Sequence, residues 1–204
     1  MSETPPSSTP IDDAASGLAA RLQRSVVAVI SEGGAGSGTA WRDGQTIVTN
    51  HHVAQHDDVR VVGSDGRDGR EYDGHVIARH VDHDLAVIHV PAANFEPIEA
   101  GDALAVSAGS ALFAVGNPWG QRGAVTAGVA LVRPAKDEFL RADIQLAPGN
   151  SGGPLADGHG RVLGINSMIS GGMALAVPAY LVHQILADAP GPAIPWVDGD
   201  TVIV

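Results

Sequence analysis

The sequence predicts an all-β protein built as two small barrels, with one short helix before them and one behind them. Three observations predict this class. Short apolar runs rich in Val and Ile recur every ten or so residues, turn-forming Gly, Asp and Asn separate them, and the runs fall into two groups. The chain of 204 residues contains no cysteine, and at this length it can bury a sizeable core without disulfide bonds.

The N-terminal segment is predicted to be a short tail followed by a helix. The first ten residues contain five Ser or Thr and three Pro, too little apolar surface to become ordered, so we expect a disordered tail. From Ile11 to Arg24, Leu18 and Leu22 are spaced for one face of a helix. Asp12 or Asp13 is expected to cap its start. We place one folded domain over residues 11–204.

The expected strands are the apolar runs of the two groups, at about residues 25–107 for the first barrel and 111–177 for the second. In chain order they are SVVAVIS, TIVTN, DVRVV, GHVIARHV, LAVIHV, ALAVS, ALFAVG, AVTAGVALV, DIQLA, VLGINSMI and MALAVP. Behind them, residues 178–189 place three apolar side chains on one helical face after a proline that suits a first turn, which predicts a closing helix. The last stretch, PGPAIPWVDGDTVIV, has extended character but no predicted place.

The charge balance and the apolar segments argue against two classes of partner. There are 12 Lys and Arg against 23 Asp and Glu, a net charge of −11, which repels the phosphate backbone of nucleic acids. No run approaches the 18 or so apolar residues of a membrane span, and the N-terminus has neither a basic nor an apolar stretch. We therefore expect no nucleic-acid partner, no membrane segment, no secretion signal and a cytoplasmic location.

One segment surrounds a hydroxyl group with small residues. Residues 149–155, Gly-Asn-Ser-Gly-Gly-Pro-Leu, place three glycines and Ser151 between two apolar runs. Glycines on both sides of a serine allow a sharp turn that presents backbone N–H groups beside the hydroxyl, as a nucleophile with an oxyanion site requires. Taken alone, the segment is also typical of a glycine turn with an incidental serine, so its context has to decide.

A serine nucleophile needs a histidine base, and the histidine needs a buried carboxylate that fixes its tautomer. The sequence offers both at the edges of apolar runs. His51 and His52 end the run TIVTNHHVA, and Asp84, with Asp82 nearby, opens the run DLAVIHV. Side chains at strand ends can leave the core and converge in a cleft. These residues are therefore candidates for a catalytic triad with Ser151.

Four ordered segments carry a resemblance to a known family. They are TNHHV at the histidines, DLAVIHV at the aspartate, AVGNPWGQRGAVTAGVALV in the second half and DIQLAPGNSGGPL at the serine, and VLGIN and ALAVP follow them. Over about residues 25–188 the chain resembles the trypsin-like serine proteases, specifically their bacterial HtrA/Deg branch. The resemblance implies a chymotrypsin-like fold of two six-stranded antiparallel β-barrels, and the order His, Asp, Ser is the order of that architecture.

The resemblance implies which histidine and which aspartate act. The family's catalytic histidine directly precedes an apolar residue, so His52 is the implied general base and acid. His51 departs from the family pattern, because a small or amide residue usually stands there, and its side chain should point elsewhere. Asp84 abuts the run LAVI directly, so it is the implied orienting carboxylate in preference to Asp82.

The same resemblance makes Ser151 the nucleophile and places the oxyanion hole at Gly149, Asn150 and Ser151. The donors are the N–H groups of Gly149 and Ser151, with Asn150 between them shaping the turn. The implied activity is hydrolysis of unfolded or extended polypeptides through an acyl-enzyme, without a cofactor. The alternative is a protease-fold peptide-binding or chaperone-like protein with a collapsed oxyanion hole, which holds extended peptides by strand addition.

The positions that line the substrate pocket in this family are mostly apolar here. The implied substrate-binding residues are Leu146, before the serine, and Met173 and Ala174, in the strand that ends in AVP. Gln145 stands six residues before Ser151, where an aspartate would select Lys or Arg. We therefore expect small or medium apolar residues, such as Val, Ala, Leu or Met, before the scissile bond.

Two further patterns do not predict a site. Seven of the nine histidines lie between His51 and His89, but no HExxH or comparable set accompanies them, so we expect no bound metal. The stretch GGAGSG, residues 33–38, lacks the Lys-Ser/Thr ending of a phosphate loop and precedes a strand. We expect a turn between the first two strands there rather than a nucleotide site.

The chain also departs from the HtrA pattern. Such proteins usually add peptide-binding PDZ modules and form trimers through an N-terminal segment with aromatic residues. Here about 16 residues follow the closing helix, and residues 1–24 contain no Phe, Tyr or Trp. We therefore expect no PDZ module and make no prediction of oligomeric state. The segment RPAKDEFLRAD resembles the family's activation region, which can open or collapse the oxyanion hole.

Overall fold

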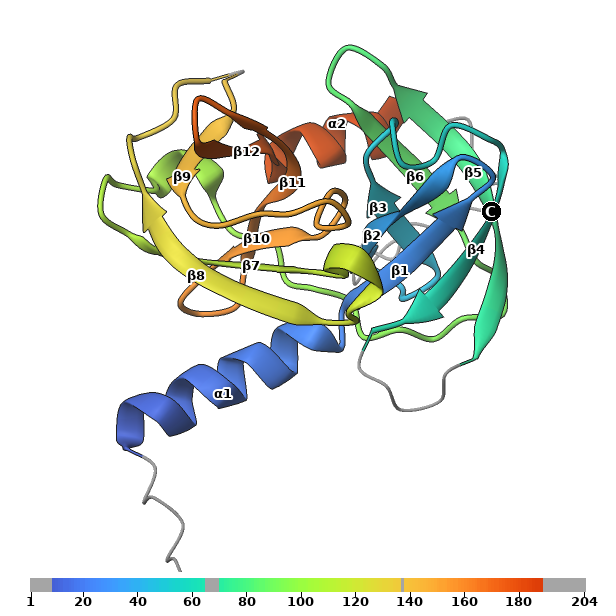
Figure 1. The fold of residues 1–204 in the computed structure, drawn as a ribbon. Coiled ribbons are helices and arrows are strands. Elements are labelled where there is room, and N and C mark those ends of the chain that lie inside the picture. The colour runs from blue at the N-terminus through green and yellow to red at the C-terminus, as the bar shows by residue number, and fades with distance from the viewer. Residues whose placement is uncertain (1–8, 65–69, 137, 189–204) are drawn as a thin grey trace, which may run out of the picture.

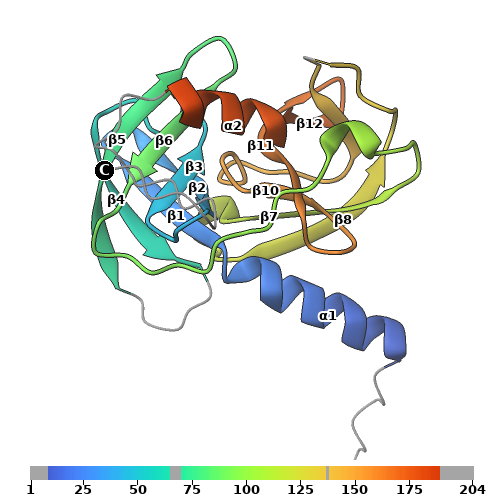
Figure 2. The same cartoon turned by 180° about the vertical axis from the view of Figure 1, so that it is seen from behind.

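The computed structural model describes residues 9–64, 70–136 and 138–188. Most of the predicted tail, residues 1–8, and the stretch from residue 189 onward lie outside the described residues. The fold is two closed antiparallel β-barrels side by side, with α2 lying across both and α1 projecting from below (Figures 1 and 2). The predicted fold class, with two six-stranded barrels and two helices, is confirmed.

Each barrel contains six strands. The first barrel is built from β1 (Val26–Ser31), β2 (Gly34–Trp41), β3 (Thr46–Thr49), β4 (Asp58–Gly63), β5 (Glu71–His80) and β6 (Leu85–His89). The second is built from β7 (Ala111–Gly116), β8 (Ala124–Ala130), β9 (Leu140–Asp143), β10 (Pro154–Asp157), β11 (Val162–Ser170) and β12 (Met173–Pro178). The helices are α1 (Pro10–Gln23) and α2 (Ala179–Asp188).

The two barrels share one strand order. Around the first barrel the order is β1-β2-β3-β6-β5-β4, and around the second it is β7-β8-β9-β12-β11-β10. All pairs are antiparallel, and each ring closes, so neither barrel leaves an open edge. The order places β3 beside β6, with Thr49 opposite Ala86. The end of β3 and the start of β6 therefore lie at the same rim of the first barrel.

The apolar core has three parts. One cluster fills the first barrel around Val29, Ile47 and Ile88, and another fills the second barrel around Leu112 and Leu140. The third lies between the barrels and includes residues of both, together with side chains of α1 and α2. Because the third cluster joins the halves, the rims that face one another across the junction are held in one arrangement.

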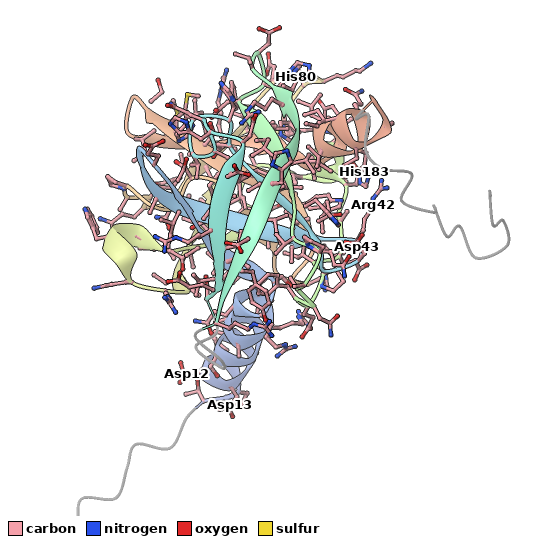
Figure 3. All side chains as sticks on the ribbon, turned by 90° about the vertical axis from the view of Figure 1, so that its right-hand side faces the viewer. Asp12, Asp13, Arg42, Asp43, His80 and His183 are labelled. Atoms are coloured by element: carbon pink, nitrogen blue, oxygen red, sulfur yellow. The ribbon has the colours of Figure 1, made fainter. Side chains whose placement is uncertain are left out.

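The helix α2 packs against strands of both barrels. Val182 and Leu181 are buried in the cluster between the barrels. On its outer side, His183 lies 3.3 Å from Arg42 and meets the edge of the Trp41 ring, so the helix also contacts the end of β2 (Figure 3). Burial, and then the nearby Arg42 charge, lower the pKa of His183 below its ordinary value.

The start of α1 differs from the prediction. The helix begins at Pro10, and Thr9, not Asp12 or Asp13, is its N-cap. The Thr9 side chain accepts from the Asp12 N–H, and the Asp12 carboxylate accepts from the Thr9 N–H, which makes a reciprocal capping box. The expectation of an aspartate cap is wrong because proline suits the first helical position and leaves the preceding Thr9 to act as the cap. Leu18 is buried as predicted.

Three predictions of local structure also differ. The run DIQLA belongs to a strand only through Asp143, the last residue of β9, and its other four residues lie in the loop before Ser151. The run ALAVS forms a short 3₁₀ helix at Ala103–Ala105, and Asp102 caps it through its side chain. The run GGAGSG is largely β2 rather than a turn, since that strand already begins at Gly34. Glycine is needed there for close approach: a Cβ at Gly36 would lie 2.7 Å from a Val53 methyl group.

Candidate active site

The structure brings His52 and Asp84 together at the rim of the first barrel. His52 follows β3, Asp84 precedes β6, and the pairing of these strands makes them neighbours. His52 Nδ1 lies 2.8 Å from Asp84 Oδ2, and the His52 backbone N–H donates to Asp84 Oδ1 at 3.0 Å. Because a carboxylate only accepts, Nδ1 carries a proton, and in the neutral ring the lone pair then lies on Nε2.

The backbone of Asp84 is also held in place. Its φ is 51°, in the left-handed region that aspartate tolerates better than most residues. Its carbonyl accepts from the His51 N–H at 3.2 Å and from Asn50 Nδ2 at 2.9 Å. Asp82, the alternative candidate for the orienting carboxylate, is exposed and makes none of these contacts. The tight turn therefore aims the Asp84 carboxylate at His52.

Ser167, on β11 of the second barrel, is a site residue that the sequence analysis missed. Its hydroxyl donates to Asp84 Oδ2 at 2.7 Å, and its carbonyl accepts from the Ser151 hydroxyl at 3.0 Å. Burial alone would raise the pKa of Asp84. The hydrogen bonds from the His52 ring, the Ser167 hydroxyl and the His52 backbone together outweigh burial, so the pKa of Asp84 lies below its ordinary value.

The loop that carries Ser151 depends on its glycines. Gly149 has a φ of 106° and Gly152 a φ of 88°, both in the region that favours glycine. A Cβ at Gly149 would overlap the Asn117 carbonyl, and one at Gly152 would overlap the Ser37 carbonyl. The loop is therefore pressed against both barrels and cannot carry side chains at these two positions without rearrangement.

Two backbone donors of this loop are free. The neighbouring N–H groups are used internally, since Asn150 donates to Ala147 and Gly153 donates to Asn150, both at 3.0 Å. Among the described residues, the N–H groups of Gly149 and Ser151 have no intramolecular acceptor. Gly149 lines the cleft together with Ser151. A ligand oxygen in that cleft could therefore accept from this pair.

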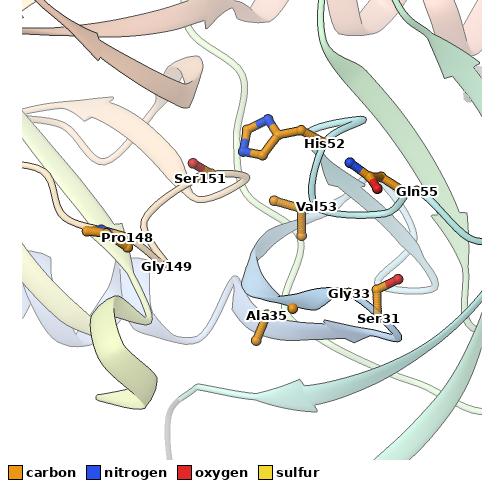
Figure 4. A pocket seen from close by; sticks show the side chains of 10 residues that line it. Ser31, Gly33, Ala35, His52, Val53, Gln55, Pro148, Gly149 and Ser151 are labelled. Carbon is orange, nitrogen blue, oxygen red and sulfur yellow. The ribbon is translucent and has the colours of Figure 1, made fainter.

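The cleft between the barrel rims has a volume of about 370 Å³. Figure 4 shows the His52 ring turned toward Ser151 across it, from the opposite barrel, whereas the Ser151 hydroxyl is turned away from the ring and donates to the Ser167 carbonyl. Its lining is Ser31, Gly33, Gly34, Ala35, His52, Val53, Gln55, Pro148, Gly149 and Ser151. Nearly all of these side chains are small or uncharged, so the cleft suits an extended backbone more than a highly charged ligand.

The predicted substrate-binding residues lie elsewhere. Ala174 is buried at 2% exposure in the core of the second barrel, and Leu146 packs against the same cluster. Met173 is half-buried at the start of β12. None of the three lines the described cleft. Gln145 is exposed, and its carbonyl accepts from the Thr126 hydroxyl.

The other histidines are dispersed. His75 pairs with Asp58 at 3.0 Å, and His80 lies against His83. The Nδ1 atom of His51 is buried and has no hydrogen-bond partner among the described residues. No group of three metal-ligating side chains occurs in the part of the chain that the structure describes. Within the same residues, neither helix is long and apolar enough to cross a membrane.

Two antiparallel barrels with a His–Asp pair facing a glycine-flanked serine define the class of trypsin-like peptidases. The family model described as "Trypsin-like peptidase domain" matches residues 36–165, and the chain belongs to this family. The resemblance to the HtrA/Deg branch is confirmed by relatives that are named serine endoproteases and a Do-like protease. The predicted enzyme class, a serine peptidase, is that of the family.

The similar proteins include two curated relatives and one solved structure. A probable periplasmic serine endoprotease DegP-like of Brucella suis is 36% identical over 165 residues, covering 74% of this chain and 32% of that protein. Protease Do-like 1, chloroplastic, of Arabidopsis thaliana is 34% identical over 173 residues, which cover 75% of this chain and 38% of that protein. The chain spans about a third of the length of these relatives.

The structure of the HtrA-type protease AlgW with a decapeptide has the same fold. Its TM-score is 0.74 at 24% sequence identity, over 85% of this chain and 66% of that chain.

The expectation of a cytoplasmic location is wrong. Relatives from Brucella and Chlamydia are named periplasmic endoproteases. The expectation rested on the composition of the N-terminal residues, which contain neither a basic nor an apolar stretch.

Proposed function

We propose that this protein is a serine endopeptidase that hydrolyses unfolded or extended polypeptides, with Ser151 as nucleophile, His52 as general base and acid and Asp84 as the orienting carboxylate. The observation that carries the proposal is the 2.8 Å contact between Asp84 and His52 Nδ1, which leaves the other ring nitrogen facing Ser151 (Figure 4). The names of the relatives further support an extracytoplasmic location.

The first half of the reaction forms the acyl-enzyme. His52 Nε2 takes the proton of the Ser151 hydroxyl as its oxygen attacks the substrate carbonyl. For this step the hydroxyl must leave the Ser167 carbonyl, to which it donates in the free protein. The Ser151 side chain therefore has to rotate toward His52 when substrate binds, and hydrogen bonds in a substrate-free site are often looser than in the complex.

The developing negative charge needs donors that are already in place. The N–H groups of Gly149 and Ser151 are free and border the cleft, so they supply the oxyanion hole, with Asn150 shaping the turn between them. His52 then returns the proton to the leaving amine, and a water molecule activated by His52 releases the acyl group. Asp84 stays ionised throughout, which its lowered pKa supports.

The preference we propose is for small or medium apolar residues before the scissile bond. Gln145, not an acidic residue, stands at the position expected to select Lys or Arg. Beside Ser167, the exposed Met168 and Ile169 of β11 offer apolar surface to an extended chain. The alternative of a peptide-binding module with a collapsed oxyanion hole is not supported, because the Gly149 and Ser151 donors are unblocked.

The test is cleavage of a denatured protein mixture with the sites mapped by mass spectrometry. Wild type should cut mainly after Val, Ala, Leu or Met, and Ser151→Ala should lose all but a trace of the rate. Ser16→Ala is the matched control, because Ser16 is an exposed serine of α1 that does not line the cleft, and it should cleave at nearly the wild-type rate. Equal cleavage by Ser151→Ala and Ser16→Ala would contradict the proposal.

A further inference from the structure

A buried polar network joins the first barrel to the serine loop, and Ser37 of β2 lies at its centre. The Ser37 side chain is fully buried, at 0% exposure. Its hydroxyl lies 2.6 Å from the Gly149 carbonyl oxygen, 2.8 Å from the Asn117 backbone nitrogen and 3.1 Å from Asn117 Nδ2. One hydroxyl therefore contacts both the oxyanion loop and the turn that follows β7.

The chemistry of these groups fixes the direction of the hydrogen bonds. The backbone and side-chain nitrogens of Asn117 only donate, whereas the Gly149 carbonyl only accepts. The single hydroxyl proton of Ser37 therefore goes to Gly149, and its lone pairs receive the two Asn117 donors. Among the described residues, Ser37 is the one side chain that donates to the Gly149 carbonyl, and the Asn117 backbone N–H also donates to it, at 3.3 Å.

Asn117 is itself fully engaged, so the network has little freedom to rearrange. Its Nδ2 also donates to the Val27 carbonyl at 2.9 Å. Its Oδ1 accepts from the Ser64 hydroxyl at 2.7 Å and from the Gly123 N–H at 3.0 Å. Partners on both barrels thus hold Asn117, and a satisfied buried network of this kind specifies one local arrangement.

The network acts on the peptide groups that flank Gly149. The Gly149 N–H belongs to the Pro148–Gly149 peptide, whose carbonyl accepts from the Trp119 N–H at 3.0 Å. The Gly149 carbonyl belongs to the next peptide, Gly149–Asn150, and accepts from the Ser37 hydroxyl. In a trans peptide the N–H and C=O groups point in opposite directions, so the Trp119 contact sets the direction of the Gly149 N–H. The Ser37 contact holds the next peptide plane, and with both planes held the Gly149 backbone does not rotate freely.

We propose that Ser37 is a positioning residue whose hydroxyl, reaching across from the opposite barrel, holds the Gly149–Asn150 peptide and, by restricting rotation of the Gly149 backbone, keeps the neighbouring Gly149 N–H available to the oxyanion. The catalytic consequence rests on the proposed function, whereas the conformational consequence does not. The role also links the two halves of the site, because His52 and Asp84 belong to the same barrel as Ser37 while Gly149 and Ser151 belong to the other.

The test compares Ser37→Ala with Thr39→Val. Thr39 lies on the same strand, is also buried at 0% exposure, and donates across the junction to the Gly152 carbonyl at 3.0 Å. Ser37→Ala removes the donor to the Gly149 carbonyl and the acceptor of the two Asn117 donors, whereas Thr39→Val removes one donor, to the Gly152 carbonyl. Urea unfolding midpoints measure how much stability each variant loses, so that the catalytic effects can be compared with the structural ones.

The catalytic readouts separate positioning from stability. For Ser37→Ala we expect kcat for a peptide substrate to fall about ten- to hundredfold with KM changed less than about threefold, since a misplaced donor costs transition-state stabilisation. Affinity for a peptide boronic acid, whose oxygen occupies the oxyanion position, should fall by the same factor. Thr39→Val should stay within about threefold of wild type. Equal kcat in the two variants would overturn the inference.

A readout that needs no activity keeps the two proposals distinguishable. In amide NMR spectra, the Gly149 and Ser151 signals should broaden or shift in Ser37→Ala and stay unchanged in Thr39→Val. If wild type is inert, the proposed function fails, and these spectra still decide the inference: unchanged Gly149 and Ser151 signals overturn it. If Ser37→Ala does not fold, Ser64→Ala, which removes a donor to Asn117, should show the same effects more weakly, and their absence overturns the inference.

Discussion

The substitution Asp84→Asn tests the proposed triad without changing its shape. Asp84 accepts three hydrogen bonds, from the His52 backbone N–H on one oxygen and from the His52 ring and the Ser167 hydroxyl on the other. An asparagine side chain offers one oxygen and one NH₂ group. In either orientation the NH₂ group therefore meets a donor of His52.

The orientation in which the asparagine NH₂ group faces the His52 ring has a chemical consequence. If the new NH₂ group faces the His52 ring, Nδ1 must become an acceptor and the ring proton moves to Nε2. A ring with its proton on Nε2 cannot take the proton of Ser151. We expect kcat/KM to fall about 10⁴-fold, which corresponds to about 5.4 kcal/mol at 1.36 kcal/mol per factor of ten.

The assay is the hydrolysis of a fluorogenic peptide, with circular dichroism to show that the variant is folded. Asp82→Asn is the matched control, because Asp82 is exposed two residues away, and we expect it to stay within about twofold of wild type. The reasoning would be refuted if folded Asp84→Asn kept more than about a tenth of the wild-type kcat/KM, because the tautomer of His52 would then not matter.

Three further predictions concern stability. Gly152→Ala should lower the free energy of unfolding in urea by at least about 3 kcal/mol, because a Cβ there overlaps Ser37. Gly109→Ala, at a similar φ with no atom within 4 Å, should lower it by about 1 kcal/mol. Equal losses of stability in the two variants would exclude the overlap with Ser37 as the cause. Because the folded-state pKa of His183 is lowered, the unfolded chain binds more protons, and stability should fall as pH drops below about 6.5. In His183→Gln the free energy of unfolding should change less with pH between pH 7.5 and 5.5. A slope equal to that of wild type would contradict the role of His183. Leu22→Ala should lower the free energy of unfolding by about 2–5 kcal/mol, because Leu22 is 1% exposed. Ile11→Ala should lower it by less than about 0.5 kcal/mol, because Ile11 is 79% exposed. Similar losses of stability in the two variants would mean that α1 is not packed as described.

The sequence predicted the parts of the site that follow from local patterns. A histidine after one apolar run and an aspartate before another reach the same rim because β3 and β6 pair, so His52 and Asp84 meet. The glycines around Ser151 likewise predicted a sharp loop, and the φ values of that loop require them. Such features depend on strand ends and turns, which residue types specify directly.

The supporting residues could not be predicted in this way. Ser167 contacts Asp84 across 83 positions of sequence, and Ser37 contacts Gly149 across 112. Each is a small polar residue within a largely apolar or glycine-rich run, and its partner lies on the other barrel. A buried hydroxyl in such a run is the one signal that could have indicated them.

The cap of α1 was missed for a local reason. The Ser- and Pro-rich composition up to Pro10 predicted a tail, yet Thr9 and Pro10 together form a good helix start.

The most direct measurement of the central claim is the reaction of the folded protein with a fluorophosphonate probe, followed by mass spectrometry of its peptides. Only a serine activated by a base beside free N–H donors should react. The account predicts one adduct, on Ser151, at a rate that falls by orders of magnitude in His52→Ala. An intact protein that stays unlabelled, even with a bound peptide, or an adduct on a different serine would contradict it.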